Sequence, residues 1–364
     1  MKIIIVGINS WYIYHFWLPL INELKKKYNL FIVTEYDEYS NKLEEKGFKC
    51  IYVNFSNRSL NILKNIKAIH KIFSIYKKIK PDLVHHFNPK PVIIGSLVAH
   101  ILKIRFIINS YPGLGNLFRK DKIKFNIIRP FILLAYIAIN RKNVNSIFQV
   151  KKDEELFIKK KLINKSKTNY ISSSGVDTMK FKMRDSFNMK NKLKVAMISR
   201  INVDKGIDTY LKIVKKLNDR CDFFLAGQFY QFENPRFSES QLIESCDENS
   251  ITYLSFVNDM SAFLNQIDIL ILPTRRLEGV PKIILESCSC GVVPIASDIG
   301  GCGEIVLPDI NGYLIEMNNI DMFVNKIKIL DKDRLLMSYL GKNGRKLVEK
   351  NFEVSNIIAN YMHL

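Results

Sequence analysis

Short apolar runs that alternate with amphipathic stretches along the chain constrain its fold more than any other sequence feature. The runs are rich in Ile and Val and are bounded by glycine, proline or polar residues, which is typical of buried strands. In the first half we expect strands at 2–7, 30–34, 50–53, 83–86, 106–109, 147–150 and 169–171, and helices at 17–27, 37–46, 60–80, 91–102, 123–138 and 151–161. Strands that alternate with helices predict an α/β fold with a doubly wound parallel sheet.

A polar segment without periodicity, 183–192, interrupts this alternation and predicts a linker. The alternation then restarts, with strands expected at 195–199, 223–226, 251–256, 269–272 and 293–296 and helices at 207–217, 260–266, 282–290 and from 333 onward, including 356–362. A chain of 364 residues is too long for one ordinary core. We therefore predict two doubly wound domains facing a cleft, 1–182 and 193–345, and a C-terminal helix over 346–364 that crosses back.

The charge of the chain is unevenly distributed. The net charge is +20; residues 1–200 carry 38 Lys and Arg against 13 Asp and Glu, whereas residues 201–364 carry 17 against 22. A basic half fits nucleic acid, an anionic membrane face or a phosphorylated substrate. A nucleic-acid partner is excluded because no reader motif or interleaved aromatic pattern accompanies the basic residues. The alternative is a compositional bias toward Lys, Ile and Asn, but such a bias should affect both halves.

The sequence also predicts that membrane spans and metal sites are absent. No stretch of about 18 uncharged apolar residues occurs, and the most apolar one, 125–139, carries Arg129 and predicts a buried or interfacial helix. Six irregularly spaced cysteines suit the reduced thiols of a cytoplasm. The spacing of Cys288, Cys290 and Cys302 is a weak zinc pattern, and no Asp-x-Asp follows a strand, so we expect no metal.

The segment after the fourth expected strand of the second half carries the strongest chemical signal. It reads Pro-Thr-Arg-Arg-Leu-Glu-Gly-Val-Pro-Lys-Ile-Ile-Leu-Glu and ends at Glu286. Pro281 suits the first position of a helix, Gly279 allows the backbone to approach a ligand, and a helix start favours a phosphate. The Glu286 carboxylate can accept hydrogen bonds from the hydroxyls of a ribose. Glu278 would face a sugar that lies beyond the phosphates. The alternative is that both carboxylates are ordinary surface residues.

Two further loops follow strands and precede helices. The first reads Ser-Arg-Ile-Asn-Val-Asp-Lys-Gly and contains Arg200 and Lys205. Two cations beside a helix start suit a diphosphate, because Arg can bind two oxygens and Lys supplies a point charge; the alternative is that both are solvated. The second loop, 298–306, reads Asp-Ile-Gly-Gly-Cys-Gly-Glu-Ile-Val. Its glycines allow a tight turn or a close approach to a ligand at the start of a helix.

These three motifs together resemble those of retaining glycosyltransferase family 4, which has the GT-B fold of two Rossmann-like domains. The shared order is Arg-x4-Lys-Gly, Glu-Gly-x-Pro-x4-Glu and Gly-Gly-x-x-Glu, and the spacing from Glu278 to Glu286 matches the family's Glu-x7-Glu. The resemblance covers essentially the whole chain. It implies donor binding by Arg200, Lys205, Gly227, Val257, Gly279, Val280, Lys282 and Glu286, and catalytic roles for Glu278, Arg200, Lys205 and His85. The two cations would hold the diphosphate, Glu278 the donor sugar and Glu286 the ribose.

The first half resembles a narrower group, the bacterial enzymes that extend polyprenyl-diphosphate-linked sugars. The matching segments are Tyr-His-Phe-Trp-Leu-Pro at 14–19, Val-His-His-Phe-Asn-Pro-Lys-Pro at 84–91 and Tyr-Pro-Gly-Leu-Gly-Asn-Leu-Phe at 111–118. The resemblance implies acceptor binding by Tyr14, His15, Asn88, Lys90, Gly113, Leu114 and Gly115. Many relatives carry a His before the Gly-x-Gly, where this chain has Pro112. His15, His85 and His86 are possible substitutes, although a lone His at a strand end is also a common structural residue.

The resemblance implies a specific activity. A hexose or N-acetylhexosamine would move from a nucleotide-sugar, expected to be a UDP-sugar, with retention of configuration and without a metal. The acceptor would be a polyprenyl-diphosphate-linked saccharide of surface polysaccharide or glycan biosynthesis. Docking to the anionic inner face of the cell membrane is then expected through Lys64, Lys67, Lys71, Arg119, Lys120, Lys122 and Lys124. A sugar-nucleotide 2-epimerase of similar fold and a non-catalytic relative stay open as alternatives.

Overall fold

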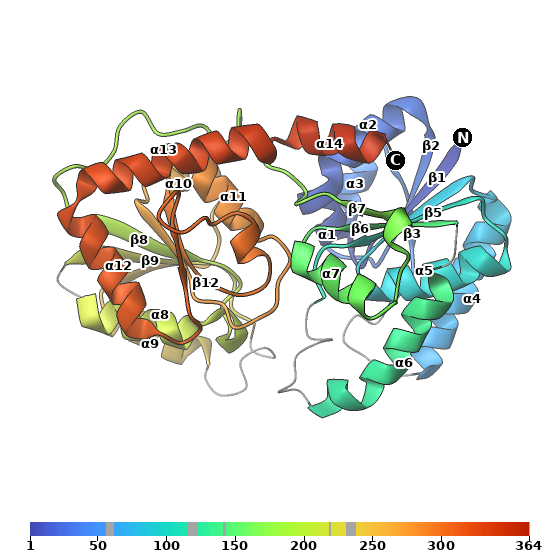
Figure 1. Cartoon of the computed structure of the whole chain (residues 1–364), viewed down its shortest axis with the longest axis horizontal. Helices are drawn as coiled ribbons and strands as arrows, with labels where there is room; N and C mark the ends of the chain where they lie inside the picture. Colours follow the sequence, from blue (N-terminus) through green and yellow to red (C-terminus); the bar gives the residue numbers. More distant parts are fainter. Residues whose placement is uncertain (56–61, 115–122, 141–142, 218–219, 231–237, 364) are drawn as a thin grey trace. The chain divides into compact units, whose positions relative to one another are not determined.

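The chain forms two compact units. The computed structural model describes residues 1–55, 62–114, 123–140, 143–217, 220–230 and 238–363 (Figure 1). The first unit comprises Met1–Ser174 with Ile358–Leu364, and the second comprises Gly175–Ile357. Each unit contains one parallel sheet, with helices on its faces (Figure 1). The predicted α/β class and the two doubly wound, Rossmann-like sheets are confirmed.

The first unit is built on a seven-stranded parallel sheet of order β3-β2-β1-β4-β5-β6-β7. Its strands are β1 Lys2–Val6, β2 Asn29–Thr34, β3 Lys49–Tyr52, β4 Leu83–Phe87, β5 Phe106–Tyr111, β6 Val144–Phe148 and β7 Thr168–Tyr170. In the centre, Ile4 of β1 lies opposite Phe31 of β2 and Val84 of β4. Strands covered on both faces need apolar side chains on both, which explains the runs of Ile and Val. The strand order reverses between β1 and β4.

Helices connect these strands and bury both faces of the sheet. They are α1 Ser10–Tyr12, a π-helix Ile13–Trp17, α2 Leu18–Lys27, α3 Ser40–Glu45, α4 Ile62–Ile79, α5 Pro89–Ile101, α6 Ile123–Ile139 and α7 Lys151–Lys159, with a 3-10 turn at Lys165–Lys167. One apolar cluster contains Ile4 and Tyr76, and another contains Tyr111 and Phe157. The helix predicted to begin at Trp17 is thus preceded by a further α-helical turn and a π-helical turn.

The second unit is built on a six-stranded parallel sheet of order β10-β9-β8-β11-β12-β13. Its strands are β8 Leu193–Ile198, β9 Cys221–Ala226, β10 Ile251–Leu254, β11 Ile269–Leu272, β12 Val293–Ser297 and β13 Tyr313–Ile315. Its helices are α8 Ile207–Leu217, α9 Glu239–Glu248, α10 Met260–Leu264, α11 Lys282–Ser289, α12 Ile320–Lys332, α13 Arg334–Asn351 and the start of α14 Val354–Met362, with 3-10 turns at Val203–Lys205 and Gly300–Glu304. In Figure 1, α8 and α9 lie below this sheet and α10, α11 and α13 above it.

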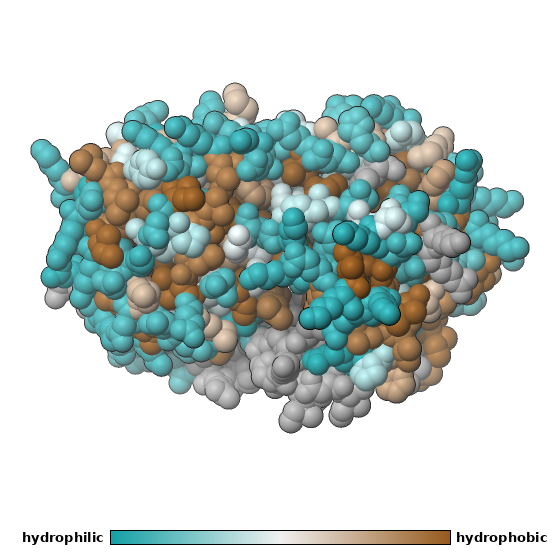
Figure 2. All heavy atoms as spheres, in the orientation of Figure 1, coloured by the Kyte–Doolittle hydropathy of each residue, from teal (hydrophilic) through white to brown (hydrophobic). Residues whose placement is uncertain are grey.

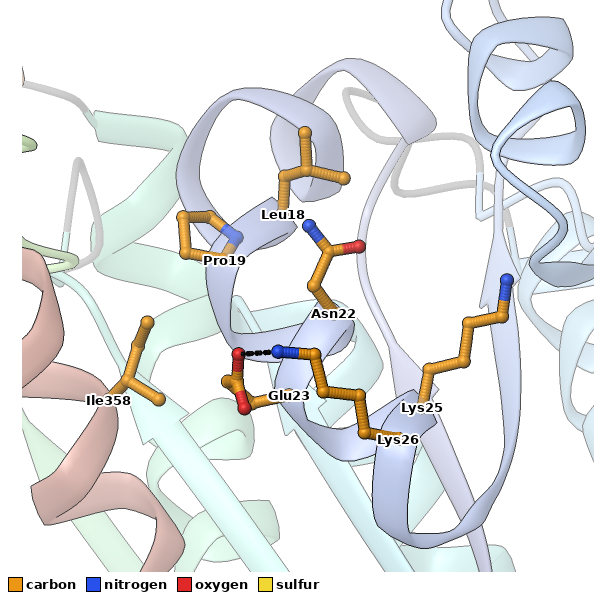
Figure 3. A pocket seen from close by; sticks show the side chains of 7 residues that line it. All are labelled: Leu18, Pro19, Asn22, Glu23, Lys25, Lys26 and Ile358. Atoms are coloured by element: carbon orange, nitrogen blue, oxygen red, sulfur yellow. Dashed lines mark hydrogen bonds and ion pairs between the residues drawn. The ribbon is translucent and has the colours of Figure 1, made fainter. Parts of the chain in front are cut away.

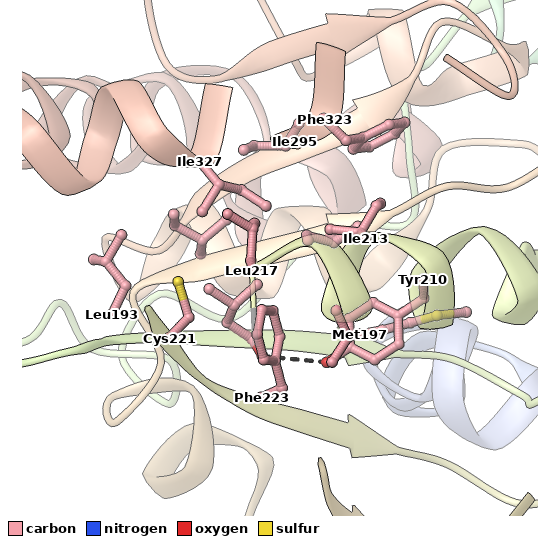
Figure 4. Packing of buried hydrophobic residues seen from close by; sticks show 14 of the residues in the cluster. Leu193, Met197, Tyr210, Ile213, Leu217, Cys221, Phe223, Ile295, Phe323 and Ile327 are labelled. Carbon is pink, nitrogen blue, oxygen red and sulfur yellow. Dashed lines mark hydrogen bonds between the residues drawn. The ribbon is translucent and has the colours of Figure 1, made fainter. Parts of the chain in front are cut away.

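The core of the second unit joins its sheet to α8 and α12. Met197 and Phe223 of the strands pack in one buried cluster with Tyr210 of α8 and with Phe323 and Ile327 of α12 (Figure 4). All five are at most 2% exposed. Burial of apolar area of this kind is the main favourable contribution to folding.

Three elements of the second unit were not predicted from the sequence: α9, β13 and α12. α9 begins with a capping box between Ser238 and Gln241, a signal that the sequence does carry. β13 has only three residues, which is too short for an alternating pattern to be recognised. The loop 298–306 was expected to open a helix, but it contains only the short 3-10 turn Gly300–Glu304.

The polar segment 183–192 is not where the chain divides, because the division follows Ser174. Within the second unit, Arg184 Nη1 lies 3.0 Å from Oδ1 of Asp268, and both side chains are buried. Asn188 Nδ2 donates to the other carboxylate oxygen of Asp268 at 2.9 Å. The polar residues that suggested a linker therefore fix this segment to the unit, since a buried carboxylate needs such partners.

The C-terminal end of the chain returns to the first unit, as predicted. α13 continues through the expected boundary at 345, and the residues from Ile358 onward belong to the first unit. There the ring of Tyr361 lies 5.1 Å from that of Trp17 and 5.9 Å from that of His85. Within the described ranges, none of the helices combines the length and hydropathy that crossing a bilayer requires.

Candidate functional site

The loops that carry the predicted donor-binding residues leave neighbouring strands of the second unit. β8 and β11 pair in parallel, with Val195 opposite Ile269, so their carboxyl ends meet at one edge. The loop after β8 contains Arg200 and Lys205, and the loop after β11 contains Glu278. The strand order reverses between these two strands, which is where doubly wound sheets bind their ligands.

A tight turn fixes Lys205 at the end of the β8 loop. The Asn202 side chain accepts the backbone N–H of Lys205 at 2.9 Å. Gly206 has a φ of 84°, and a Cβ on it would lie 2.0 Å from the carbonyl oxygen of Pro273. Only glycine fits this combination of left-handed backbone and close contact. The β8 and β11 loops are therefore packed backbone against backbone.

An ion pair joins the two loops. Lys205 Nζ lies 2.5 Å from Oε1 of Glu278, and the two side chains are only 13% and 14% exposed. The hydroxyl of Thr274, which is fully buried, donates to Oε1 of Glu278 at 3.2 Å. Lys205 and Glu278 come from two motifs that were predicted to contact one donor, and the fold places them in direct contact.

Glu278 is a carboxylate at neutral pH. Burial raises the pKa of its carboxyl, but the Lys205 ammonium, helped by Arg276 and the Thr274 hydroxyl, brings that pKa below its ordinary value. Hydrogen bonds and positive charges that favour the ionised form have this effect. Glu278 is therefore suited to accepting hydrogen bonds from hydroxyl groups and not to donating a proton.

The second carboxylate of the motif lies inside α11. Lys282 Nζ is 3.9 Å from Oε1 of Glu286, and these side chains are 29% and 14% exposed. Burial raises the pKa of Glu286, although Lys282 opposes this, and burial also lowers the pKa of Lys282. Pro281 is the residue before the helix and not its first residue, because its ψ of 117° is extended. Glu286, the fifth of the eight residues of α11, is thus a partly buried carboxylate in the second turn of that helix.

Glycines of the 298–306 loop support the backbone around Glu278. The Gly301 N–H donates to the carbonyl oxygen of Glu278 at 2.9 Å. A Cβ on Gly301 would lie 2.5 Å from the carbonyl oxygen of Gly279. Gly301 therefore allows a close approach to the backbone of the neighbouring loop, and the predicted approach to a ligand stays a prediction.

The remaining predicted donor-binding residues lie around the same edge of the sheet. Gly227 follows β9 and donates its N–H to the Leu254 carbonyl at 2.9 Å. Val257 follows β10 and is half-buried, as is Arg200, whereas Val280 is buried. Arg200, Lys205, Gly227, Val257, Gly279 and Val280 thus stand in segments that follow strands of one sheet, whereas Lys282 and Glu286 stand in α11.

Among the predicted acceptor-binding residues, Tyr14 and His15 lie in the π-helix that follows β1. Their rings are half-buried and lie 5.2 Å and 4.6 Å from that of Tyr39. Trp11, at 5.0 Å from His15, extends this aromatic group toward solvent. Isolated π-helical turns are frequent at functional sites.

Asn88 and Lys90 follow β4, the strand beside β1. Asn88 adopts a positive φ of 72°. Lys90 Nζ donates to the Phe55 carbonyl at 3.0 Å and to Oδ1 of Asn65 at 3.4 Å. Burial lowers the pKa of Lys90, and Glu35 opposes that effect. These residues and the π-helix lie at the carboxyl edge of the first sheet, where its strand order reverses.

His85, predicted to be catalytic, is a buried imidazole with 4% exposure. Its Nε2 lies 2.8 Å from the Ser110 hydroxyl. Burial, with a smaller contribution from His86, lowers the pKa of His85 to about 3. His86 is also fully buried, with its Nε2 2.9 Å from the hydroxyl of Tyr76. Neutral imidazoles in such surroundings fit the structural alternative better than a catalytic role.

The predicted loop 113–118 is described only in part. Gly113 is half-buried, whereas Leu114 belongs to an apolar cluster and donates its N–H to Oδ2 of Asp153 at 3.2 Å. Burial of Leu114 indicates a packing role. Outside the described residues lie Gly115, Arg119, Lys120, Lys122 and the side chain of Lys124.

Sequence reasoning missed Thr274 and Arg275. Thr274 follows β11 directly after Pro273 and contacts Glu278. Arg275 Nη2 lies 2.7 Å from Oδ2 of Asp208 at the start of α8, which holds the β11 loop against that helix. The signal for Thr274 is its position, because a hydroxyl just after a strand of a doubly wound sheet reaches the ligand edge.

A surface pocket on α2 is separate from these residues. It is lined by Leu18, Pro19, Asn22, Glu23, Lys25, Lys26 and Ile358 (Figure 3). Lys26 pairs with Glu23 at 2.6 Å, and Lys25 donates to the Lys46 carbonyl at 2.8 Å. None of the predicted site residues lines this pocket.

No metal-binding cluster of three or more His, Cys, Asp and Glu side chains is found in the described part of the chain. Burial raises the pKa of the Cys288 and Cys290 thiols to about 12, and that of Cys302 further. Protonated thiols of this kind are poor metal ligands and poor nucleophiles.

Both halves of the chain match known families. The family described as Glycosyl transferases group 1 matches residues 179–347, and the family described as Glycosyl transferase 4-like matches residues 2–151.

Curated relatives align over most of the chain. The N,N'-diacetylbacillosaminyl-diphospho-undecaprenol alpha-1,3-N-acetylgalactosaminyltransferase of Campylobacter jejuni is 28% identical over 344 residues, covering 91% of this chain and 90% of the relative. The UDP-Gal:alpha-D-GlcNAc-diphosphoundecaprenol alpha-1,3-galactosyltransferase of Escherichia coli is 23% identical and covers 85% of this chain and 81% of the relative. Among solved structures, Anabaena HepE in complex with UDP superposes with a TM-score of 0.81 at 17% identity, covering 100% of this chain and 99% of that one.

Proposed function

The chain belongs to glycosyltransferase family 4 and has the GT-B fold, and from this premise we propose its donor and acceptor. It is a glycosyltransferase of polysaccharide biosynthesis. The proposed reaction moves a hexose or an N-acetylhexosamine from a UDP-sugar to a polyprenyl-diphosphate-linked saccharide. The names of two relatives support this proposal, because both specify undecaprenol-diphosphate-linked saccharides and one specifies UDP-Gal.

The observation that carries the proposal is the contact between Lys205 and Glu278, which are 2.5 Å apart at the carboxyl edge of the second sheet. A cation and a carboxylate held together there can bind two adjacent groups of one donor, its diphosphate and its sugar. Lys205 and Arg200 would neutralise the diphosphate. Glu278 would accept hydrogen bonds from the donor sugar, and Glu286, in the second turn of α11, from the ribose.

The same residues would stabilise the leaving group. Negative charge grows on the diphosphate as its bond to the anomeric carbon breaks, and the two cations meet that charge. We propose that these cations make a metal unnecessary. The acceptor oxygen would bond to the anomeric carbon on the face that the phosphate leaves, and the acceptor proton would pass to the leaving phosphate oxygen. The product then retains the configuration of the donor.

One experiment tests donor, acceptor and stereochemistry together. The full chain is incubated with UDP- and GDP-sugars, a lipid-diphosphate-linked saccharide and, in a parallel set, EDTA. We expect UDP release that needs the acceptor, persists in EDTA and yields a product whose anomeric coupling constants show retention. Turnover of a GDP-sugar alone would overturn the UDP assignment, inversion would overturn the same-face mechanism, and a 2-epimer released without acceptor would identify an epimerase.

We further propose that the enzyme docks on the anionic inner face of the cell membrane through α4, α5 and α6 of the first unit. α5 packs against both α4 and α6. These helices expose large apolar side chains, namely Leu63, Ile66, Leu97, Ile101, Phe131, Leu134 and Ile137, and Figure 2 shows brown side chains over α6. None of the three helices contains an acidic residue. Apolar side chains among lysines favour an anionic bilayer surface.

A further inference from the structure

Thr274 belongs to the β11 loop of the proposed donor site and also contacts the β8 loop. Its side chain is fully buried. Oγ1 lies 3.2 Å from Oε1 of Glu278 and 3.3 Å from the carbonyl oxygen of Asp204, and it accepts the N–H of Arg276 at 3.2 Å. The residue thus contacts the loop that carries Lys205 and the loop that carries Glu278.

The hydroxyl of Thr274 has one proton and two acceptors within reach, so it can donate fully to only one of them. The Asp204 carbonyl already accepts the N–H of Arg275 at 2.8 Å. Donation to the ionised carboxylate of Glu278 forms the stronger, charge-assisted bond. The proton of Thr274 is therefore directed at Glu278.

We propose that Thr274 is a positioning residue that keeps the Glu278 carboxylate aimed at the donor sugar while Lys205 engages the diphosphate. This inference rests on the proposed function. In the structure, Glu278 is held by Lys205 from one loop and by Thr274 from its own. When a diphosphate draws the ammonium away, Thr274 alone would still fix the orientation of the carboxylate.

Among the described residues, Lys205, Arg276 and Cys302 are titratable groups that interact with Glu278. Lys205 approaches it from the 3-10 turn Val203–Lys205, and Arg276 belongs to its own loop. From the 298–306 loop comes the thiol of Cys302, which is protonated because burial raises its pKa. The Thr274 hydrogen bond is one of the contributions that lower the pKa of Glu278. Removing that bond therefore raises the pKa, and less of the carboxylate is ionised at mildly acidic pH.

The test compares Thr274→Val, which keeps the shape but removes the hydroxyl, with Thr274→Ser, which keeps the hydroxyl. For Thr274→Val we expect kcat to fall about tenfold, the loss of one hydrogen bond to a charged group, with little change in UDP affinity. The acid limb of kcat/KM against pH should move upward by up to about one pH unit. Thr274→Ser should keep most of the wild-type kcat, and its acid limb of kcat/KM should lie at the same pH as that of the wild type.

A titration that needs no turnover separates this inference from the proposed function. The carboxyl carbon of Glu278, labelled with ¹³C and assigned with Glu278→Gln, is followed by NMR as pH falls, and melting temperatures verify that the variants fold. An upward shift of the Glu278 pKa in Thr274→Val but not in Thr274→Ser supports the positioning role. An unchanged pKa in Thr274→Val, or equal losses in both variants, overturns it. If the wild-type chain releases UDP from none of the UDP-sugars, that result overturns the proposed function and leaves the positioning role of Thr274 to be judged by the titration.

Discussion

The proposed donor site of the second unit is organised around one salt bridge. Lys205 and Glu278 are each largely buried, and each is the other's close partner. Glycines at the contacts between the loops allow the three motifs to meet at this point. A donor that enters must exchange part of this pairing for its own phosphates and hydroxyls.

Replacing Lys205 tests this organisation. We expect Lys205→Met to slow sugar transfer by about 10²-fold or more, because the cation that meets the growing charge of the diphosphate is lost. The same loss is expected for Arg200→Ala. Initial rates at saturating UDP-sugar measure the effect. Lys216→Met, which removes an exposed ion pair with Asp321, is the control and should transfer sugar normally. Near-normal rates for Lys205→Met and Arg200→Ala would place the donor elsewhere.

Single residues of this site differ in how far the sequence identifies them. Lys205 and Glu278 stand in motifs with fixed spacing, so their contact could be expected. Thr274 stands four residues before Glu278 in the same loop, and its hydroxyl reaches Glu278 only because the loop folds back on itself, which no periodic pattern encodes. His85 shows the opposite case: its place at a strand end suggested chemistry, whereas its side chain is packed inside the unit.

At the scale of elements, strands with long apolar runs and helices with clear amphipathic periods were predicted close to their observed bounds. α8 and β11 coincide with their predicted ranges. β13 was missed because three residues carry no period, and α9 was missed although its capping box is present in the sequence. The polar segment 183–192 suggested a linker because its partners, above all Asp268, are distant in sequence.

The buried pair that holds this segment predicts a stability effect. Arg184→Met leaves Asp268 buried without its cation, and we expect the free energy of unfolding to fall by roughly 3–5 kcal/mol. Urea unfolding curves followed by circular dichroism measure it. The exposed pair of Lys216 and Asp321, with side chains 50% and 83% exposed, is the comparison. Lys216→Met should cost less than about 1 kcal/mol. Equal costs for the two variants would mean that segment 183–192 is not held by its buried pair.

At the scale of the whole molecule, an excess of basic side chains and a group of exposed apolar side chains occur together in the first half of the chain. Residues 1–200 carry 38 basic against 13 acidic side chains, whereas the remainder carries 17 against 22. The lysines at 64, 67 and 71 are exposed on α4. α6 exposes Phe131, Leu134 and Ile137, spaced three residues apart along one stripe. Electrostatic attraction and apolar insertion can then add up at one bilayer surface.

Co-sedimentation with lipid vesicles tests this docking. We expect the chain to bind vesicles that contain anionic phospholipid and not neutral ones, because each basic side chain near an anionic surface contributes about 1 kcal/mol. Binding should weaken as ionic strength rises from about 0.05 to 0.5 M, since the screening length shortens. Changing the three lysines to Glu should remove the dependence on anionic lipid.

Replacing Phe131, Leu134 and Ile137 by Ser separates apolar insertion from charge, because it leaves every basic side chain in place. We expect binding to anionic vesicles to fall at all salt concentrations, and most clearly at high salt, where insertion alone would hold the protein. Leu335→Ser with Tyr339→Ser is the matched control, because these side chains of α13 are 74% and 56% exposed in the second unit. That control should bind as the wild type does. Equal binding to neutral and anionic vesicles, or an equal loss in both serine variants, would contradict docking through α4, α5 and α6.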